Sequence, residues 1–268
     1  MDDQQFRQLL EHFGYSWRGY RKVRKGVKKR IIKHMQEIGC RSMETYLDSL
    51  DRDEALRDQC ESLMCVSISR FFRDRLLWKA VEDQIVPCLL EENIKRLKLW
   101  FAGCACGEEV YSFKILWEGL KDRFDHPMPE LGIWATDINR VFLRRAQDGV
   151  YAFSSLKEVP VKLKEIFFIS HGDRGPYTIV PSLKQGIRWR VHNLSSKFDE
   201  FNFHIIFLRN SILTYYNDEL KQAAFQKVID SLNNGGFLII GTHEKLPFES
   251  GDLVPFGSQH YVFKKIRR

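Results

Sequence analysis

The stretch WFAGCACGEEVYSF, residues 100–113, decides how the chain is expected to fold. Its apolar beginning is typical of a buried strand, and the two glutamates behind it are typical of the first turn of a helix. A strand, a turn of small residues and a helix predict the first unit of a parallel sheet, with a ligand site beyond the carboxyl end of the strand. The residues that allow a ligand to approach the backbone closely are Ala102, Gly103, Ala105 and Gly107.

The charges at this turn favour a ligand with a positive group. A pyrophosphate would be repelled by Glu108 and Glu109 at the helix N-terminus, whereas an ammonium or sulfonium group would be attracted. Asp137, at the end of the next expected strand, is placed to accept hydrogen bonds from a ribose. S-adenosylmethionine carries all three groups. The structural alternative is that the acids only complement the helix dipole and that the small residues only permit tight packing.

We do not expect a metal site at this turn. No second pair of cysteines or histidines lies near Cys104 and Cys106.

The composition limits the class of protein that the chain can be. The hydrophobic fraction of 44% excludes a disordered chain, and the longest apolar runs are too short to span a bilayer. The polar, acidic start predicts no signal peptide, and the cysteines lack the spacing of a disulfide scaffold, so we expect a cytoplasmic protein with reduced thiols.

The net charge of +7 is unevenly distributed. Between Arg18 and Lys33 the chain has nine basic residues and no acidic residue. Such a segment indicates an acidic partner: a negatively charged protein face, a nucleic acid or a membrane surface. The alternative is a solvated helical face without a partner.

The first part of the chain, residues 1–85, is expected to form a helical domain. Apolar residues recur at helical spacing along residues 20–39, and Gly39 is suited to end that helix. Further helices are expected at 42–50 and 53–65.

From residue 86 to 268 the pattern changes to alternating strands and helices, which predicts a second, α/β domain with a mainly parallel, Rossmann-like sheet. Turn signals between short β-rich pieces in residues 166–192 predict a small antiparallel insertion. The expected strands are 98–103, 131–137, 201–210, 237–244 and 260–265, and the expected helices are 108–120, 139–149 and 218–236.

Five blocks in order along about 180 residues resemble the CheR-type methyltransferases, which methylate glutamates of bacterial chemoreceptors with S-adenosylmethionine. The blocks are SISRFFRD at 67–74, WFAGCACGEEVYS at 100–112, WATDIN at 134–139 with DGVY at 148–151, FHIIFLRNSILTYYN at 203–217, and NNGGFLIIGTHEKL at 233–246. The resemblance implies a class I methyltransferase fold and a receptor-facing role for the basic segment from Arg18 to Lys33.

The resemblance also implies the cofactor contacts. Arg73 is the expected partner of the cofactor's carboxylate, and Asn193 with Leu194 would hold the adenine. S-adenosylmethionine, and its product S-adenosylhomocysteine, would be bound by Ser67, Ser69, Arg73, Gly103, Glu108, Glu109, Asp137, Asn193, Leu194, Arg209 and Asn210.

The chain departs from the family pattern near the expected acceptor. The family's reacting-site tyrosine aligns with Thr214, and Tyr215 follows one position later; Ser67 and Lys98 replace an asparagine and an arginine. We expect Tyr215 or Thr214 to orient the acceptor, with Lys98 as a supporting cation, although the tyrosine could simply cover the sheet.

Protein-carboxylate methylation is the first hypothesis. The alternatives are methylation of a small acid, amine or natural product and a non-catalytic S-adenosylmethionine-binding regulator. A nucleic-acid methyltransferase is disfavoured because RNSI stands where exocyclic-amine enzymes carry an asparagine or aspartate and two prolines.

Overall fold

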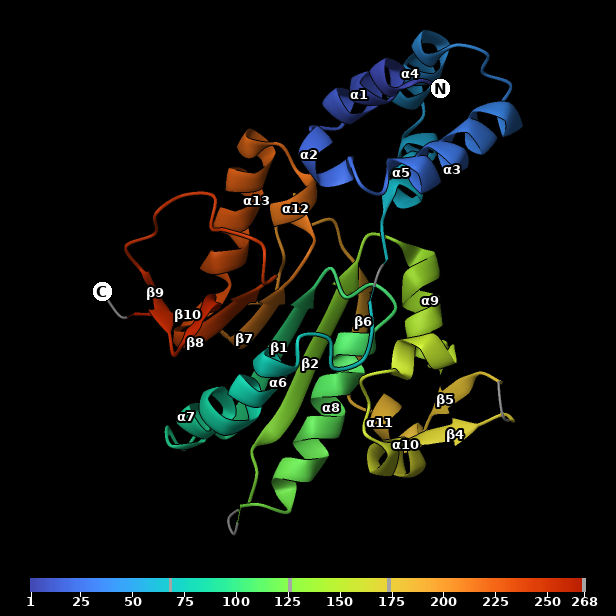
Figure 1. The fold of residues 1–268 in the computed structure, drawn as a ribbon. Helices are drawn as coiled ribbons and strands as arrows, with labels where there is room; N and C mark the ends of the chain where they lie inside the picture. Colours follow the sequence, from blue (N-terminus) through green and yellow to red (C-terminus); the bar gives the residue numbers. More distant parts are fainter. Residues whose placement is uncertain (68, 125–126, 173–174, 267–268) are drawn as a thin grey trace.

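A computed structural model describes residues 1–67, 69–124, 127–172 and 175–266 (Figure 1). A cluster of N-terminal helices lies above the carboxyl ends of the central strands, and a small second sheet lies beside the large one. This arrangement confirms the predicted α/β fold with a mainly parallel sheet, a small antiparallel sheet and N-terminal helices.

The large sheet has seven strands within the described residues, in the order β6-β2-β1-β7-β8-β10-β9. Its parallel part runs from β6 to β8, while β10 pairs antiparallel with both β8 and β9. The strands are β1 Arg96–Ala102, β2 Glu130–Asp137, β6 Ile187–Val191, β7 Phe203–Leu208, β8 Leu232–Ile240, β9 Leu253–Phe256 and β10 Gln259–Lys265.

The crossover helices explain why the strand residues are apolar on both faces. The sheet runs from β1 to β2 in one direction and from β7 to β8 in the other, so right-handed crossovers place α8 and α13 on opposite faces. The helices of this part are α6 Arg75–Ala80, α7 Val86–Leu90, α8 Glu108–Lys121, α9 Arg140–Asp148, α12 Ile212–Tyr215 and α13 Asp218–Asp230, with a π-helical turn at Val81–Ile85.

Two expected boundaries were wrong. The helix predicted for residues 218–236 ends at Asp230, and the following glycines lie inside β8, where the pairing with β7 shifts register and Gly235 has φ +83°. The glycines therefore allow an irregularity in a strand and do not terminate the helix. The helix predicted for 20–39 begins only at Arg24, although Gly39, at φ +77°, follows its end as expected.

The small sheet also differs from the predicted range of 166–192. It consists of β3 Val150–Tyr151, β5 Tyr177–Ile179 and β4 Phe168–Ser170, in that order and antiparallel. The last piece of the predicted range, β6, pairs parallel with β2 and forms the edge of the large sheet. Short helical segments connect this region: a 3₁₀ turn at Phe153–Leu156, α10 Val161–Phe167 and α11 Pro181–Lys184.

The N-terminal helices have a core of their own. It is formed by buried side chains from Phe6 to Met64, whereas Leu77 to Leu90 belong to the core of the large sheet. We therefore propose that the helical domain ends near residue 66, not at residue 85. Its helices are α1 Asp3–His12, α2 Trp17–Tyr20, α3 Arg24–Glu37, α4 Met43–Arg52 and α5 Glu54–Met64; α4 is capped by Ser42, which accepts from the N–H of Thr45.

The helical domain docks on α12 through backbone contacts. The N–H of Ser16 donates to the carbonyl of Tyr215 at 2.7 Å, and the N–H of Asn217 donates to the carbonyl of Gly14 at 2.8 Å. Between these bonds, Gly19 lies so close to α12 that a Cβ on it would overlap the carbonyl oxygen of Thr214 and lie 3.0 Å from the carbonyl carbon. Only glycine allows α2 to approach this closely.

Gly19→Ala should lower the free energy of unfolding by about 1–3 kcal/mol, because the new methyl group must push α2 away from α12. Denaturant unfolding measures the change. The matched control is Gly119→Ala, since Gly119 is an exposed residue in α8 with no neighbouring atom within 4 Å of the place that a methyl group would take, and alanine there should stabilise by about 0.5–1 kcal/mol. Equal stability of Gly19→Ala and the wild type would contradict the docking.

Candidate functional site

A cavity lies between the carboxyl ends of the parallel strands and the helical domain. The sheet side contributes the turns after β1, β2, β6 and β7, and the helical side contributes Tyr15, Tyr20 and Glu61. The location is the one that the strand order predicts for a ligand.

The turn after β1 is held open by unusual backbone geometry. Gly103 and Gly107 have φ of +82° and +85°, and Ala105 also has a positive φ of +48°. A Cβ on Gly103 would lie 3.0 Å from the Cβ of Ser211, so a side chain there would narrow the space beside the β7 turn.

Asp137 fixes this turn from the end of β2. Its carboxylate accepts the N–H of Ala105 at 2.9 Å on one oxygen and the N–H of Asn139 at 2.9 Å on the other. Burial raises the pKa of this carboxyl, and the two backbone hydrogen bonds oppose that rise. A carboxylate has about four acceptor positions, so Asp137 keeps capacity for a ligand's hydroxyl groups while it lines the cavity.

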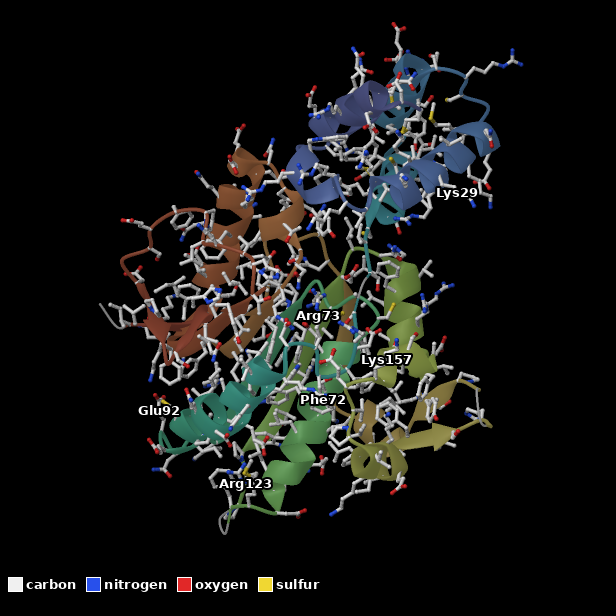
Figure 2. The ribbon with its side chains drawn as sticks, viewed as in Figure 1. Lys29, Phe72, Arg73, Glu92, Arg123 and Lys157 are labelled. Carbon is white, nitrogen blue, oxygen red and sulfur yellow. The ribbon has the colours of Figure 1, made fainter. Side chains whose placement is uncertain are left out.

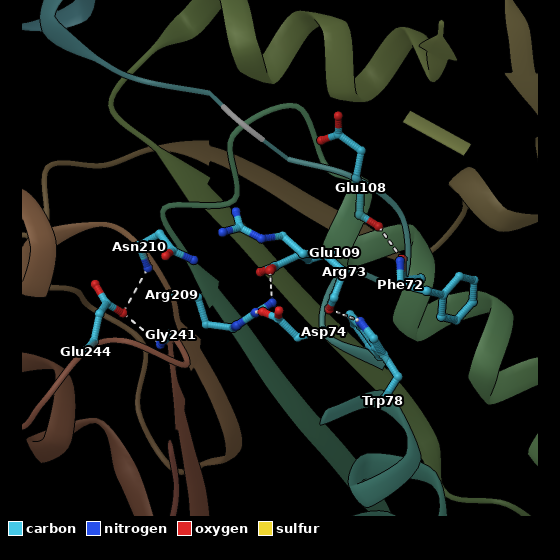
Figure 3. A network of polar contacts seen from close by, with 11 residues as sticks. Phe72, Arg73, Asp74, Trp78, Glu108, Glu109, Arg209, Asn210, Gly241 and Glu244 are labelled. Carbon is cyan, nitrogen blue, oxygen red and sulfur yellow. Dashed lines mark hydrogen bonds and ion pairs between the residues drawn. The ribbon is translucent and has the colours of Figure 1, made fainter. Parts of the chain in front are cut away.

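Arg209 is the centre of an ion-pair cluster at the bottom of the cavity (Figure 3). Its fully buried guanidinium pairs with Asp74 and Glu109, so three segments that are distant in sequence meet at one side chain. Asp74 adopts a left-handed conformation at φ +64°, directly before α6. Two carboxylates around one guanidinium carry a net negative charge, which favours a cationic ligand nearby.

Glu244 forms a second polar cluster, which the sequence did not indicate (Figure 3). Its buried carboxylate accepts the N–H of Asn210 at 2.9 Å and the N–H of Gly241 at 2.7 Å. It also accepts the hydroxyl of Thr214 at 2.5 Å. Burial raises the pKa of this carboxyl, and the bond from Thr214 lowers it. Thr214 is therefore engaged beneath the β7 turn and does not line the cavity.

The side of the cavity next to β6 combines an amide with a tyrosine cluster. Asn193 donates to Glu61 at 3.5 Å and accepts from the hydroxyl of Tyr216 at 3.4 Å, while Leu194 is buried beside it. The hydroxyl of Tyr15 donates to Glu61 at 3.3 Å, and burial raises the pKa of that carboxyl.

Ser67 and Glu108 lie in an adjoining groove. This groove is lined by α3, α5 and α9, and it shares Ser69 with the main cavity. Glu108 is buried, which raises the pKa of its carboxyl, and a hydrogen bond with Ser69 lowers it. Ser67 contacts the sulfur of Cys106 at 3.7 Å.

Lys98 is not brought to the site. It precedes the carboxyl end of β1 by four residues, about 13 Å along the strand. Its ammonium group donates to the carbonyl of Phe201 at 2.7 Å, pairs with Glu200 at 3.5 Å and lies over the ring of Trp134. The prediction of Lys98 as a supporting cation at the acceptor is therefore wrong, because strand direction places it near the other end of the sheet.

Most of the other predicted residues line the cavity together. These are Ser69, Arg73, Gly103, Glu109, Asp137, Asn193, Leu194, Arg209, Asn210 and Tyr215. The contribution of the helical domain and of Tyr216 and His192 was not predicted, because no spacing rule connects residues 15, 20 and 61 with the sheet. The signal that could have found them is the density of tyrosines at 15, 20, 215 and 216.

The basic segment is partly engaged within the helical domain. Arg24 and Lys28 pair with Asp3, and Arg30 donates to the carbonyls of Leu63 and Cys65. Other basic side chains of this segment remain exposed: Arg21, Lys22, Lys25 and Lys29. Figure 2 shows Lys29 on α3.

The chemical groups that line the cavity fit S-adenosylmethionine. It offers carboxylates at Asp137, Glu109 and Glu61, an apolar contact at Leu194 and a guanidinium at Arg73. Within the described ranges, no group of three or more histidine, cysteine or acidic side chains is arranged to hold a metal ion. In the same residues, no helix has the length and apolarity to cross a membrane.

Comparisons with known proteins agree with this chemistry. A family model described as "CheR methyltransferase, SAM binding domain" matches residues 67–262. The "Chemotaxis protein methyltransferase" of Listeria innocua serovar 6a is 34% identical over 220 residues, 82% of this chain and 81% of the relative. That of Vibrio parahaemolyticus is 29% identical over 197 residues, 73% of this chain and 70% of the relative.

Among solved structures, SAM-bound CalS10 from Micromonospora echinaspora, an amino pentose methyltransferase, is 16% identical, with a TM-score of 0.37 over 66% of this chain and 56% of that one. The family match covers well over half of the chain and confirms the resemblance found in the sequence. The chain therefore belongs to the CheR methyltransferase family and is an S-adenosylmethionine-dependent methyltransferase.

Proposed function

We propose that the protein transfers methyl groups to glutamate side chains of an acidic protein acceptor. The observation that carries this proposal is the position of the cavity, between the turns after the parallel strands and a helical domain with exposed lysines. The printed name of the Listeria innocua relative, a chemotaxis protein methyltransferase, supports a methyl-accepting receptor helix as the acceptor.

The cofactor would be held by the residues that line the cavity on the sheet side. Asp137 would accept from the ribose hydroxyls, and Asn193 with Leu194 would contact the adenine. Arg73 would pair with the cofactor's carboxylate, and the acidic cluster of Asp74, Glu109 and Arg209 would favour its positive groups. When bound, S-adenosylmethionine supplies the methyl group on a sulfonium.

The protein needs no general base for a carboxylate acceptor, because a glutamate is already ionised at neutral pH. Its task is to exclude water and to orient the acceptor. Tyr215 lines the cavity, and burial raises the pKa of its hydroxyl, so the hydroxyl stays protonated and can donate to a carboxylate oxygen. Thr214 would act indirectly, through its bond to Glu244.

The function is tested by measuring binding of S-adenosylmethionine and S-adenosylhomocysteine and then following labelled methyl transfer. The acceptors to compare are a cytoplasmic receptor fragment with methyl-accepting helices and a set of small acids and amines. A methyl ester on protein that is released by alkali supports the proposal. A stable small-molecule product would assign the enzyme to another acceptor class, and tight binding without transfer to any acceptor would contradict catalysis.

Asp137→Asn should weaken binding of S-adenosylhomocysteine about tenfold or more, because a charged acceptor of ribose hydroxyls is lost. Calorimetric titration measures the dissociation constant. The matched control is Asp148→Asn, which makes the same chemical change at an exposed position at the end of α9 and should bind like the wild type. Unchanged affinity in Asp137→Asn would remove this carboxylate from the cofactor site.

Tyr215→Phe should lower methyl transfer about tenfold while the dissociation constant of S-adenosylhomocysteine stays within about twofold of the wild type. The ring is retained, so its contacts with Tyr20 persist. Initial rates with labelled cofactor measure the effect. Transfer at the wild-type rate would exclude the Tyr215 hydroxyl from acceptor binding.

Lys25→Glu combined with Lys29→Glu should weaken acceptor binding about three- to tenfold at low salt and reduce its dependence on salt, because two exposed positive charges are reversed. Lys28 is left unchanged because it pairs with Asp3. The control reverses the exposed Lys79 and Lys95 in the sheet domain. Equal losses in both double variants would show that overall charge, and not α3, attracts the acceptor.

A further inference from the structure

Tyr20 is a buried side chain of the helical domain that lines the cavity. It is 3% exposed, and its hydroxyl forms no hydrogen bond with any of the described residues. Three of the four other buried tyrosines have an engaged hydroxyl: that of Tyr46 bonds with His34, that of Tyr111 with Ala146 and that of Tyr151 with Cys106. The exception among the described residues is Tyr261 in β10, which does not line the cavity. Because the hydroxyl of a buried tyrosine usually has a hydrogen-bond partner, we expect a ligand in the cavity to supply the partner for Tyr20.

The fold fixes Tyr20 beside Tyr215. The rings are 4.9 Å apart between centroids and tilted by 56°. The close approach of Gly19 to the Thr214 carbonyl and the bond from Ser16 to the Tyr215 carbonyl hold the two side chains in this relation. Two tyrosines from different domains therefore line the same part of the cavity.

Both hydroxyl groups are donors at neutral pH. Burial raises the pKa of Tyr20 well above its ordinary value, and the neighbouring groups Cys65, Tyr215, Tyr216 and Cys60 act in the same direction. Burial also raises the pKa of Tyr215; Glu244 and Cys65 add to this rise, and the positive charge of Arg73 opposes it. Like Tyr20, Tyr215 forms no hydrogen bond through its hydroxyl with any of the described residues.

We propose that Tyr20 and Tyr215 together bind the carboxylate of the methyl acceptor, each donating to one of its two oxygens. The inference rests on the proposed function and assigns the helical domain a direct contact with the acceptor group. A carboxylate is the complementary ligand because it has only acceptors, and two donors can bind it at the same time. Thr214, at the position where the family resemblance places a tyrosine, is engaged with Glu244 and cannot supply this donor.

The role of Tyr20 is to position the acceptor. The carboxylate loses its negative charge as it becomes an ester, so hydrogen bonds to it are stronger before the transfer than after it. Removing one such bond should therefore mainly raise the KM for the acceptor. Removing a group that stabilises only the transition state would instead lower kcat.

The direct test uses glutarate as a small carboxylate probe and fluorine NMR as the readout. 3-Fluorotyrosine is incorporated at position 20, at position 215 or, as control, at position 177 in the small sheet, so that each hydroxyl is kept. Glutarate is titrated to about 100 mM into the protein saturated with S-adenosylhomocysteine and into the protein alone. The signals from positions 20 and 215 should shift with one common dissociation constant, and the signal from position 177 should not.

A signal from position 20 that does not respond to glutarate in either titration would overturn the inference. Failure of S-adenosylhomocysteine to bind would instead contradict the cofactor site, and the titration of the protein alone would still test Tyr20. A kinetic measurement adds an independent readout: Tyr20→Phe should reduce kcat/KM for the protein acceptor about tenfold, mostly through KM, with the cofactor's dissociation constant unchanged. A wild-type KM in this variant would also contradict the inference.

Discussion

The ion pairs of Arg209 connect the parts of this protein that must be in place together. Arg209 follows β7, and Glu109 lies in the first turn of α8, behind the turn that follows β1. Asp74 ends the segment that leads from the helical domain to α6. Removing the guanidinium would leave two partly buried carboxylates without a partner, a change that typically costs about 3–5 kcal/mol. Arg209 thus holds the carboxylates of Asp74 and Glu109 together beside the cavity. Those two carboxylates outweigh its single positive charge, so the cluster is negative overall.

The sheet and the turn after β1 could be predicted because local rules determine them. Apolar strands, the glutamates that start α8 and the acid at the end of β2 follow the spacing expected for parallel strand–helix units, and the polar residues at the strand ends converge in the cavity. The same rules misplaced β6, because short β-rich pieces with turn signals look alike whether they join the large sheet or a small one. Gly235 and Gly236 were predicted to end a helix because glycines at the end of a helix and glycines in an irregular strand look alike in a sequence.

The contribution of the helical domain could not be predicted from spacing. Tyr15, Tyr20 and Glu61 reach the cavity only because α2 docks on α12, and that contact depends on a glycine whose missing side chain leaves no pattern in the sequence. Lys98 illustrates the opposite error. A motif position indicated a role at the acceptor, but the direction of β1 places the side chain near the other end of the sheet, where Glu200 and the Phe201 carbonyl bind it.

This methyltransferase lacks a tyrosine at position 214. Among the described residues that line its cavity, two tyrosine hydroxyls have no hydrogen-bond partner, that of Tyr20 in the helical domain and that of Tyr215 in α12. The most direct measurement of the central claim, that the cofactor site lies between the two domains, is a crystal structure with S-adenosylhomocysteine. The account predicts density for the ligand in this cavity, with the ribose at Asp137 and the adenine beside Leu194. Ligand density elsewhere, or a helical domain separated from α12 in the complex, would contradict it.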